Sequence, residues 1–271
     1  MKLRDELRLR ARELGRRVED GVTDSGQVAV YLRQLLRGNR APPSSSNREA
    51  SAHPSPRGSG QAPWPPVLLI HGYMANRGSV HLLESRLTNL GHVVITYPLG
   101  PLHLGDIRES AGFIQRKVES LIHQTGVPQI DIVAHSMGGL VALDYVKRLG
   151  GAERTRKLVL LGTPIRGTWA AALGLVTAPF GRASLQLLPG STFLRELLQA
   201  PLPSGPEITA IAAERDWLAP PRTTVMSGVH QISVATGHTG LLVDEQIAFR
   251  VAEVLAAPGG QTTLGNDHHA G

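Results

Sequence analysis

Apolar and polar residues follow two alternating patterns from residue 67 onward. Short, continuous apolar runs are typical of buried strands and predict them at 67–70, 92–98, 129–134, 157–164, 207–213 and 230–235. Between these runs, apolar residues recur at helical spacing, which predicts helices at 79–91, 106–122, 137–149 and 241–257. Strands that alternate with helices form a mainly parallel sheet covered by helices on both faces. The pattern therefore predicts an α/β domain.

Residues 165–205 interrupt this alternation. They contain Trp169, Phe180, Phe193, many leucines and alanines, and scattered prolines and glycines. A stretch of this length is too long for an ordinary connection between two elements. It predicts a partly helical cap inserted into the domain.

The N-terminal region has a different character. Residues 1–40 are predicted to form a basic helical arm. In its first part, at 2–20, arginines surround an apolar face made of Leu3, Leu7, Leu14 and Val18. Two interpretations stay open: a helix that packs on its own domain, and a helix that binds anionic membrane lipid or a partner helix. The rest is interpreted as a Pro/Ser/Gly-rich linker at 41–63, the folded domain at 64–257 and a tail at 258–271.

Charge and composition exclude several classes of protein. The net charge is +6, but residues 1–40 contain ten Lys or Arg against six Asp or Glu, so the folded domain is nearly neutral and no nucleic-acid surface is expected. Cysteine is absent, which excludes disulfide bonds, thiolate metal sites and a cysteine nucleophile. We expect no cofactor and no metal.

The sequence also bears on location. No apolar run approaches the ~20 residues of a membrane-spanning helix. Charged residues occupy the place where a signal peptide would have its apolar core. The protein is therefore predicted to be cytoplasmic, with the basic arm as a candidate for peripheral contact with a membrane.

The candidate chemistry centres on Ser136, in the stretch DIVAHSMGGLVA between a predicted strand and a predicted helix. Small residues at Ala134 and Gly138 allow the sharp turn that brings a helix back close to its strand. The arrangement matches the nucleophile elbow G-x-S-x-G, with alanine in place of the first glycine. It places the hydroxyl at the carboxyl end of a strand and at a helix N-terminus, where backbone N–H groups favour a developing negative charge. Ser136 is therefore the predicted nucleophile.

A serine hydroxyl needs a base to become a good nucleophile. His238 is the best candidate, because it follows the last predicted strand in VATGHTGLL, between glycines that let a loop project its ring over the sheet edge. Three other histidines are weaker candidates. The backbone of His71 is better placed to act than its ring, and His230 starts a strand at the wrong edge of the sheet. Strand alternation turns His135 away from Ser136, so it is interpreted as a packing residue.

The base needs a carboxylate to hold its tautomer and stabilise the imidazolium. Asp216, in AERDWLAP, also follows a predicted strand and so lies at the same edge of the sheet. The order Ser136, Asp216, His238 is the chain order known for this arrangement. Glu214 stays an alternative, whereas Asp244 falls within the last helical pattern and is interpreted as a cap or a solvent-exposed group.

The oxyanion that forms during attack needs two preorganised N–H donors. The backbone N–H of Met137, directly after the nucleophile, is one candidate. The other is expected from the loop after the first strand, HGYMANRGS, which places Tyr73 near the site while Gly72 lets the loop pass close to it. We therefore predict an oxyanion hole formed by the N–H groups of Tyr73 and Met137.

These pieces resemble the α/β-hydrolase-fold serine lipases and esterases of bacteria. LLIHGYM, DIVAHSMGGLVA, LVLLGTPIRGT, ERDWLAP and GHTGLL carry the resemblance over roughly residues 64–257, and the A-H-S-M-G elbow is similar to that of small Bacillus-type lipases. In GTPIRGT, Ile165 stands where the family has histidine, outside the triad and oxyanion positions. The resemblance implies an α/β-hydrolase fold, a triad of Ser136, Asp216 and His238, and oxyanion amides at Tyr73 and Met137.

The function expected from the sequence is hydrolysis of carboxylic esters through an acyl-enzyme on Ser136. Apolar residues in the cap favour a lipase or esterase that degrades lipid-like esters. A thioesterase, an acyltransferase or an amidase would use the same triad, and a non-catalytic scaffold is an alternative of a different class. Because the basic arm is interpreted as separate from the domain, deletion of residues 1–60 is expected to leave ester hydrolysis largely intact.

Overall fold

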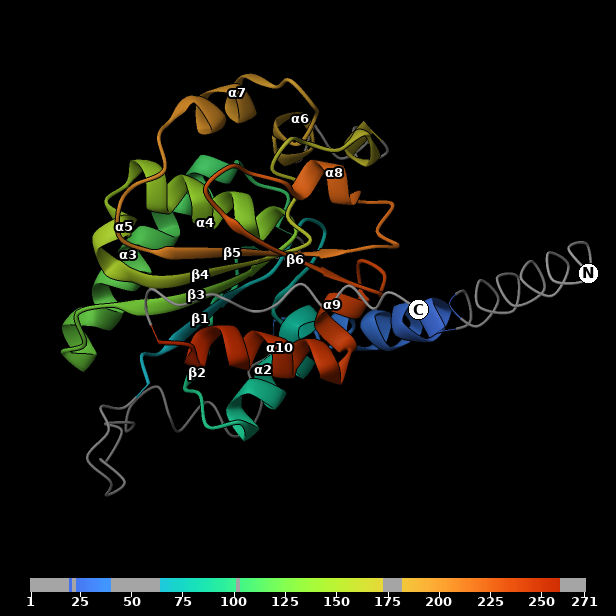
Figure 1. Ribbon diagram of the computed structural model, residues 1–271, viewed down its shortest axis with the longest axis horizontal. Helices are drawn as coiled ribbons and strands as arrows, with labels where there is room; N and C mark the ends of the chain where they lie inside the picture. Colours follow the sequence, from blue (N-terminus) through green and yellow to red (C-terminus); the bar gives the residue numbers. More distant parts are fainter. Residues whose placement is uncertain (1–19, 21–22, 40–63, 101–102, 173–181, 259–271) are drawn as a thin grey trace, which may run out of the picture.

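Six parallel strands form the centre of the molecule in the computed structural model, which describes residues 20, 23–39, 64–100, 103–172 and 182–258 (Figure 1). They are β1 (Val67–Ile70), β2 (Val94–Thr96), β3 (Ile130–His135), β4 (Thr155–Leu161), β5 (Glu207–Ala213) and β6 (His230–Val234). Their order in the sheet is β2-β1-β3-β4-β5-β6, and each of these neighbouring pairs is parallel. The predicted strands and the α/β fold are confirmed.

Helices cover both faces of the sheet (Figure 1). One face carries α3 (Ile107–Thr125), α4 (Met137–Arg148) and the short α5 (Gly151–Arg154), and the other carries α2 (His81–Asn89), α9 (Gly240–Val243) and α10 (Glu245–Ala256). Alternate residues of β1 supply the two cores. Leu68 and Ile70 pack into the apolar cluster that includes α3 and α4. Val67 and Leu69 pack into the cluster that includes α2 and α10. Burial of each such side chain stabilises the folded protein by about 1.5–3 kcal/mol. Because both faces of β1 are buried, all its residues are apolar and form a continuous run.

Two of the predicted helices are divided in the structure. The segment predicted as one helix at 79–91 consists of a 3-10 helix, η1 (Arg77–Val80), followed by α2. Near the C-terminus, Asp244 separates α9 from α10, because its backbone is extended and its side chain accepts a hydrogen bond from the Gln246 N–H at 2.9 Å. Asp244 is thus the N-cap of α10, one of the two roles expected for it.

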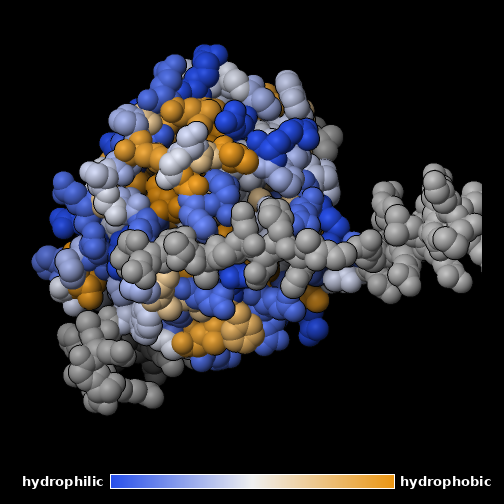
Figure 2. Space-filling model, in the orientation of Figure 1, coloured by the Kyte–Doolittle hydropathy of each residue, from blue (hydrophilic) through white to orange (hydrophobic). Residues whose placement is uncertain are grey.

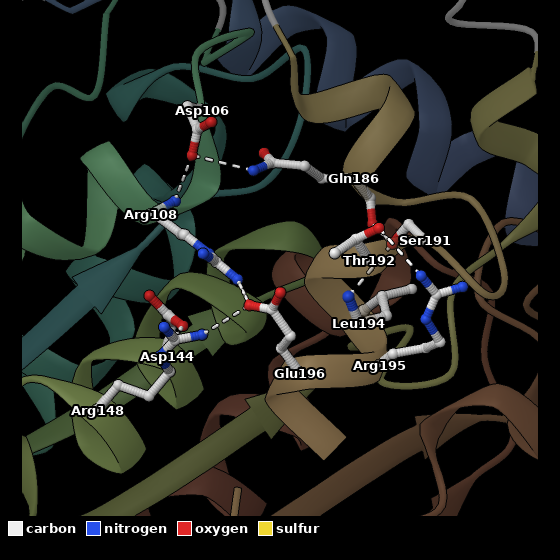
Figure 3. A network of polar contacts seen from close by, with 10 residues as sticks. All are labelled: Asp106, Arg108, Asp144, Arg148, Gln186, Ser191, Thr192, Leu194, Arg195 and Glu196. Carbon is white, nitrogen blue, oxygen red and sulfur yellow. Dashed lines mark hydrogen bonds and ion pairs between the residues drawn. The ribbon is translucent and has the colours of Figure 1, made fainter. Parts of the chain in front are cut away.

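Polar side chains join the cap to the domain (Figure 3). The described part of the cap includes α6 (Ala183–Gln186) and α7 (Thr192–Gln199), with residues 173–181 outside the described ranges. Glu196 of α7 forms ion pairs with Arg108 of α3 and Arg148 of α4. The Arg108 guanidinium lowers the pKa of Glu196, so this carboxylate stays charged at neutral pH. The pairs hold α7 over the two helices that cover this face of the sheet.

Within the arm predicted to be helical at 1–40, the structure has a helix at residues 23–35 (blue in Figure 1), beyond the stretch whose apolar face the sequence pattern described. Its side turned toward the domain is largely polar: Asp24 and Gln27 form hydrogen bonds with the domain, and Gln34 is only 6% exposed. Leu32 of the same helix is 51% exposed. This helix therefore contacts the domain through polar side chains and through Tyr31, which packs against the apolar cluster that includes α2 and α10.

Three predicted segments fall almost entirely outside the described residues. They are the helix at 2–20, the linker at 41–63 and the tail at 258–271. The apolar face predicted for the first of these, and its contact with a membrane, stay predictions. Within the ranges that the structure describes, no helix combines the length and apolarity needed to cross a membrane.

Candidate active site

Ser136 lies at a strained turn between β3 and α4. Its backbone has φ 54° and ψ −127°, a conformation that non-glycine residues rarely adopt and that is often found at functional sites. After this turn, the start of α4 packs directly against the end of β1, which only a residue without a side chain allows. A Cβ atom added to Gly138 would lie 2.6 Å from the carbonyl oxygen of His71 and 2.8 Å from that of Ile70. The small neighbour expected two residues after Ser136 is therefore required by close packing of the backbone.

We expect Gly138→Ala to destabilise the protein by about 1–3 kcal/mol, since the added methyl group would meet backbone atoms, which cannot move aside as a flexible side chain can. Urea unfolding measures this loss. Gly112→Ala in α3 is the matched control, because its added Cβ would meet only the Arg116 side chain at 3.7 Å. The control should be neutral or slightly stabilising, as alanine favours helices. Equal stability of the two variants would contradict the packing argument.

Asp216 and His238 are in direct contact. The Nδ1 atom of His238 lies 2.5 Å from Oδ2 of Asp216, and Oδ1 of Asp216 accepts a hydrogen bond from the Ala219 N–H at 2.7 Å. The Asp216 side chain is fully buried and that of His238 is 10% exposed. Because a carboxylate only accepts, Nδ1 donates, and Nε2 of the neutral ring is left free to accept a proton.

Ser136 is joined to this pair through the end of β4. The Ser136 N–H donates to the Leu161 carbonyl at 2.8 Å. The next residue, Gly162, has φ 55°, and a Cβ atom added to it would lie 3.2 Å from Oδ2 of Asp216 and 3.3 Å from Nδ1 of His238. Glycine is needed here both for its backbone and for the space that the pair occupies. The structure thus gathers Ser136, Asp216 and His238 around the carboxyl ends of β3 and β4.

The two residues predicted to donate to the oxyanion flank the same turn. Met137 is the first residue of α4, and its side chain is fully buried. The loop after β1 passes directly over the serine, since a Cβ atom added to Gly72 would lie 2.9 Å from Cβ of Ser136. Tyr73 follows Gly72 and packs partly against the apolar core. Gly72 therefore permits the close approach that the sequence predicted for it.

His135 lies closer to the site than the sequence suggested. It is buried, as expected of a packing residue, but it packs on His238: the ring centroids are 4.6 Å apart, and Nε2 of His135 lies 3.2 Å from the His238 carbonyl oxygen. Strand alternation determines the face toward which a side chain points but not the loop that covers that face. The sequence pattern therefore missed this contact.

A second histidine that the sequence pattern missed, His103, holds the loop after β1. Its Nδ1 atom lies 3.2 Å from the carbonyl oxygens of both His71 and Gly72, and its Nε2 atom lies 3.3 Å from the hydroxyl of Ser110. Since carbonyl oxygens only accept, Nδ1 carries the proton. No motif marks His103, because its partners are backbone atoms of a loop that only the fold brings near. Within the described residues, no cluster of His, Asp or Glu is arranged to hold a metal ion.

These buried histidines make stability depend on pH. Burial lowers the pKa of His71 from its ordinary value of 6.5 to about 4 and that of His103 to about 3, and it also lowers the pKa of His135 well below the ordinary value. Between these values and 6.5, the unfolded chain binds protons that the folded chain does not. The free energy of unfolding therefore falls as the pH drops from 6.5 toward 4.

We expect His103→Gln to reduce this acid sensitivity. At pH 5, about 1.5 units below the ordinary histidine value, each buried neutral histidine lowers the free energy of unfolding by on the order of 2 kcal/mol relative to pH 7.5. The variant should lose less stability over this interval than the wild type, measured by urea unfolding at both pH values. His123→Gln, at an exposed position of α3, is the control. An unchanged pH dependence in His103→Gln would contradict the assignment.

An all-parallel sheet with a serine elbow, beside a carboxylate–histidine pair, is the arrangement of an α/β hydrolase. The chain belongs to the alpha/beta hydrolase family, which it matches over residues 67–267. The fold class implied by the sequence resemblance is thereby confirmed.

Solved structures of lipases have a similar fold. Lipase BlEst2 of Bacillus licheniformis, in its mature form, has a TM-score of 0.61 at 13% identity over 74% of this chain and 96% of that chain. Its propeptide form has a TM-score of 0.63 at 13% identity over 76% of this chain, which spans about half (52%) of that longer one. Aspergillus fumigatus lipase B has a TM-score of 0.63 at 16% identity over 82% of this chain and 59% of that chain. At these identities the likeness concerns the fold alone.

Proposed function

We propose that the protein is a serine carboxylic ester hydrolase, a lipase or esterase that acts on lipid-like esters through an acyl-enzyme on Ser136. One observation carries the proposal: a buried Asp216 holds Nδ1 of His238 at 2.5 Å, beside a serine whose backbone is strained into an elbow. Folding alone does not require these three residues to meet. A base held by a carboxylate next to a turn of this kind is suited to activate a hydroxyl.

The reaction proceeds in two stages. Oγ of Ser136 attacks the ester carbonyl carbon as its proton passes to Nε2 of His238. The tetrahedral intermediate collapses, the bond to the alcohol oxygen breaks, and the imidazolium gives its proton to the departing alcohol, which leaves an acyl ester on Ser136. Water then attacks that ester while His238 takes its proton; the imidazolium returns this proton to Oγ of Ser136 as the acyl–Oγ bond breaks, and the acid is released.

Backbone N–H groups stabilise the negative oxygen in both stages. Those of Tyr73 and Met137 are the proposed donors, one from the loop that crosses over Ser136 and one from the first residue of α4. Loss of one such donor typically costs about 10²-fold to 10³-fold in kcat. Asp216 stabilises the imidazolium that forms at His238.

The preference for lipid-like esters is supported by the cap and by the relatives of similar fold. Figure 2 shows hydrophobic surface around α7 of the cap, and Leu185 and Leu198 are 48% and 44% exposed. The similar structures include lipases, and the A-H-S-M-G elbow resembles that of Bacillus-type lipases. A Paleococcus ferrophilus monoacylglycerol lipase is also similar, with a TM-score of 0.52 at 15% identity over 70% of this chain and 93% of that chain.

Two measurements test the proposal. A fluorophosphonate probe should label the folded protein covalently, and mass spectrometry should place the label on the peptide that contains Ser136. Initial rates with p-nitrophenyl esters from acetate to palmitate should then show turnover, with a long-chain optimum for a lipase and a short-chain optimum for an esterase. Folded protein that neither reacts with the probe nor hydrolyses any of the esters would refute the proposal. Labelling without ester turnover would instead favour acyl transfer or a thioester or amide substrate.

A further inference from the structure

Residues 20 and 23–39 contact three separate loops at the carboxyl edge of the sheet. These are the loops after β5, β6 and β1, which carry Asp216, His238 and Tyr73, respectively. We infer that this N-terminal segment is a positioning element of the active site and that Asp24 is its principal positioning residue. The inference rests on the proposed function of those three loops.

The first contact restrains the loop of Asp216. Arg215, immediately before it, donates from Nε and from a terminal nitrogen to the two carboxylate oxygens of Asp24, at 3.0 and 2.9 Å. Asp20 lies 3.3 Å from another terminal nitrogen of Arg215. A bidentate pair of this kind sets the orientation of both groups as well as their distance. Asp24 therefore restrains the chain one residue away from the carboxylate that holds His238.

The second contact restrains the loop of His238. The hydroxyl of Thr236 donates to Oε1 of Gln27 at 3.1 Å. Two residues after His238, Gly240 packs closely against Gln27, because a Cβ atom added to Gly240 would lie 2.3 Å from the same Gln27 oxygen. The Arg215 N–H also donates to the Thr236 carbonyl at 3.1 Å. The two loops are thus bonded to each other and both to one helix.

The third contact restrains the loop proposed to supply an oxyanion donor. The side chain of Asn76 donates to the Leu35 carbonyl at 3.0 Å, and the Gly78 N–H donates to the Gly38 carbonyl at 2.9 Å. Asn76 lies three residues after Tyr73 on this loop. The acceptors in both bonds are backbone carbonyls of the N-terminal segment. These two bonds therefore depend on where that segment lies more than on which side chains it carries.

A single helix and its following turn therefore connect the base, its carboxylate and the oxyanion loop. Small displacements of reacting groups cost rate steeply, whereas they affect substrate binding much less. These contacts also reverse the expectation that residues 1–60 can be removed without loss of ester hydrolysis, because such a deletion would strip all three loops of their partners. Loss of the Asp24–Arg215 pair should accordingly lower kcat while KM changes little.

The test is a double-mutant cycle in the full-length protein. Asp24→Ala, Arg215→Ala and the double variant are compared with the wild type in p-nitrophenyl ester hydrolysis. We expect each single variant to lose about 10-fold in kcat with KM within about twofold, and the double variant to lose no more than the worse single variant. Asp24→Glu, which keeps the carboxylate, should recover most of the rate.

Asp131→Asn is the matched control, because it breaks another bidentate pair, with Arg156, at the amino ends of β3 and β4. It should lower stability and leave kcat of the folded enzyme unchanged. If the wild type hydrolyses esters while both Asp24→Ala and Arg215→Ala keep its kcat, or if kcat falls as much in Asp131→Asn, the positioning role is refuted. If Asp24→Ala does not fold, Gln27→Ala is measured in its place. A wild-type kcat in Gln27→Ala would likewise refute the positioning role. An inactive, unlabelled wild type would refute the proposed function instead.

Discussion

Ser136→Ala is expected to lower kcat for ester hydrolysis by about 10⁴-fold to 10⁶-fold and to abolish labelling by a fluorophosphonate. Alanine has no hydroxyl to attack the carbonyl carbon, so no acyl-enzyme can form. Only substrate binding and the oxyanion donors would remain to assist attack by water. The measurements are steady-state kinetics with the best p-nitrophenyl ester and the intact mass of the protein after treatment with the probe.

The same substitution should leave the fold intact. The strained backbone at residue 136, with φ 54°, is imposed by the junction of β3 with α4 and by the Ser136 N–H bond to Leu161, which alanine keeps. Thermal unfolding should therefore stay close to that of the wild type. Ser120→Ala, at an exposed position of α3, is the control and should keep both activity and labelling. Wild-type turnover in Ser136→Ala would exclude Ser136 as the nucleophile.

Asp216→Asn is expected to lower kcat by about 10⁴-fold, the loss known for the same change in a serine protease triad. The structure gives a specific reason. Oδ1 of Asp216 accepts from the Ala219 N–H, so an asparagine would place its carbonyl oxygen there and turn its NH₂ group toward Nδ1 of His238. The ring would then carry its proton on Nε2, the atom that must accept the proton of Ser136. The base would be held in the wrong tautomer although the site kept its shape.

Glu214→Gln is the control for this prediction and also decides between the two carboxylates considered from the sequence. Glu214 is exposed, whereas Asp216 is buried against His238. The control should keep kcat within about twofold of the wild type, since loss of an exposed charge weakly affects a buried pair. A large loss in Glu214→Gln together with near-normal activity in Asp216→Asn would reverse the assignment.

The strands of the sheet were predictable because their environment is uniform. Each central strand of a parallel sheet is covered on both faces, so local pattern reveals apolar runs that make up all of β1 and parts of β3 (132–134) and β4 (158–161). The same regularity predicted the neighbourhood of Asp216 and His238. Both follow strands, and in a parallel sheet the carboxyl ends of the strands share one edge.

The sequence predicted a helical arm at 1–40 but not the contact of residues 23–35 with the domain, because the inward side of this helix does not resemble a core. Asp24, Gln27 and Gln34 face the domain, and Leu32 faces solvent, which is the reverse of the usual amphipathic pattern. The helix is held by an ion pair and hydrogen bonds whose partners are distant in the chain, 191 residues for Asp24 with Arg215, 209 for Gln27 with Thr236 and 41 for Leu35 with Asn76. The local spacing of apolar and polar residues does not predict contacts between residues so far apart in sequence.

The sequence by itself determined the order of the elements and the residues available for chemistry, because apolar periodicity, the small residues around Ser136 and the ends of strands are local properties of the chain. Only the tertiary structure decided that Asp216 binds His238 directly, that His135 and His103 support the site, and that a polar helix from the N-terminal arm contacts the loops around it. Those contacts depend on which loops cover which edge of the sheet, and that is settled by the packing of segments far apart in sequence.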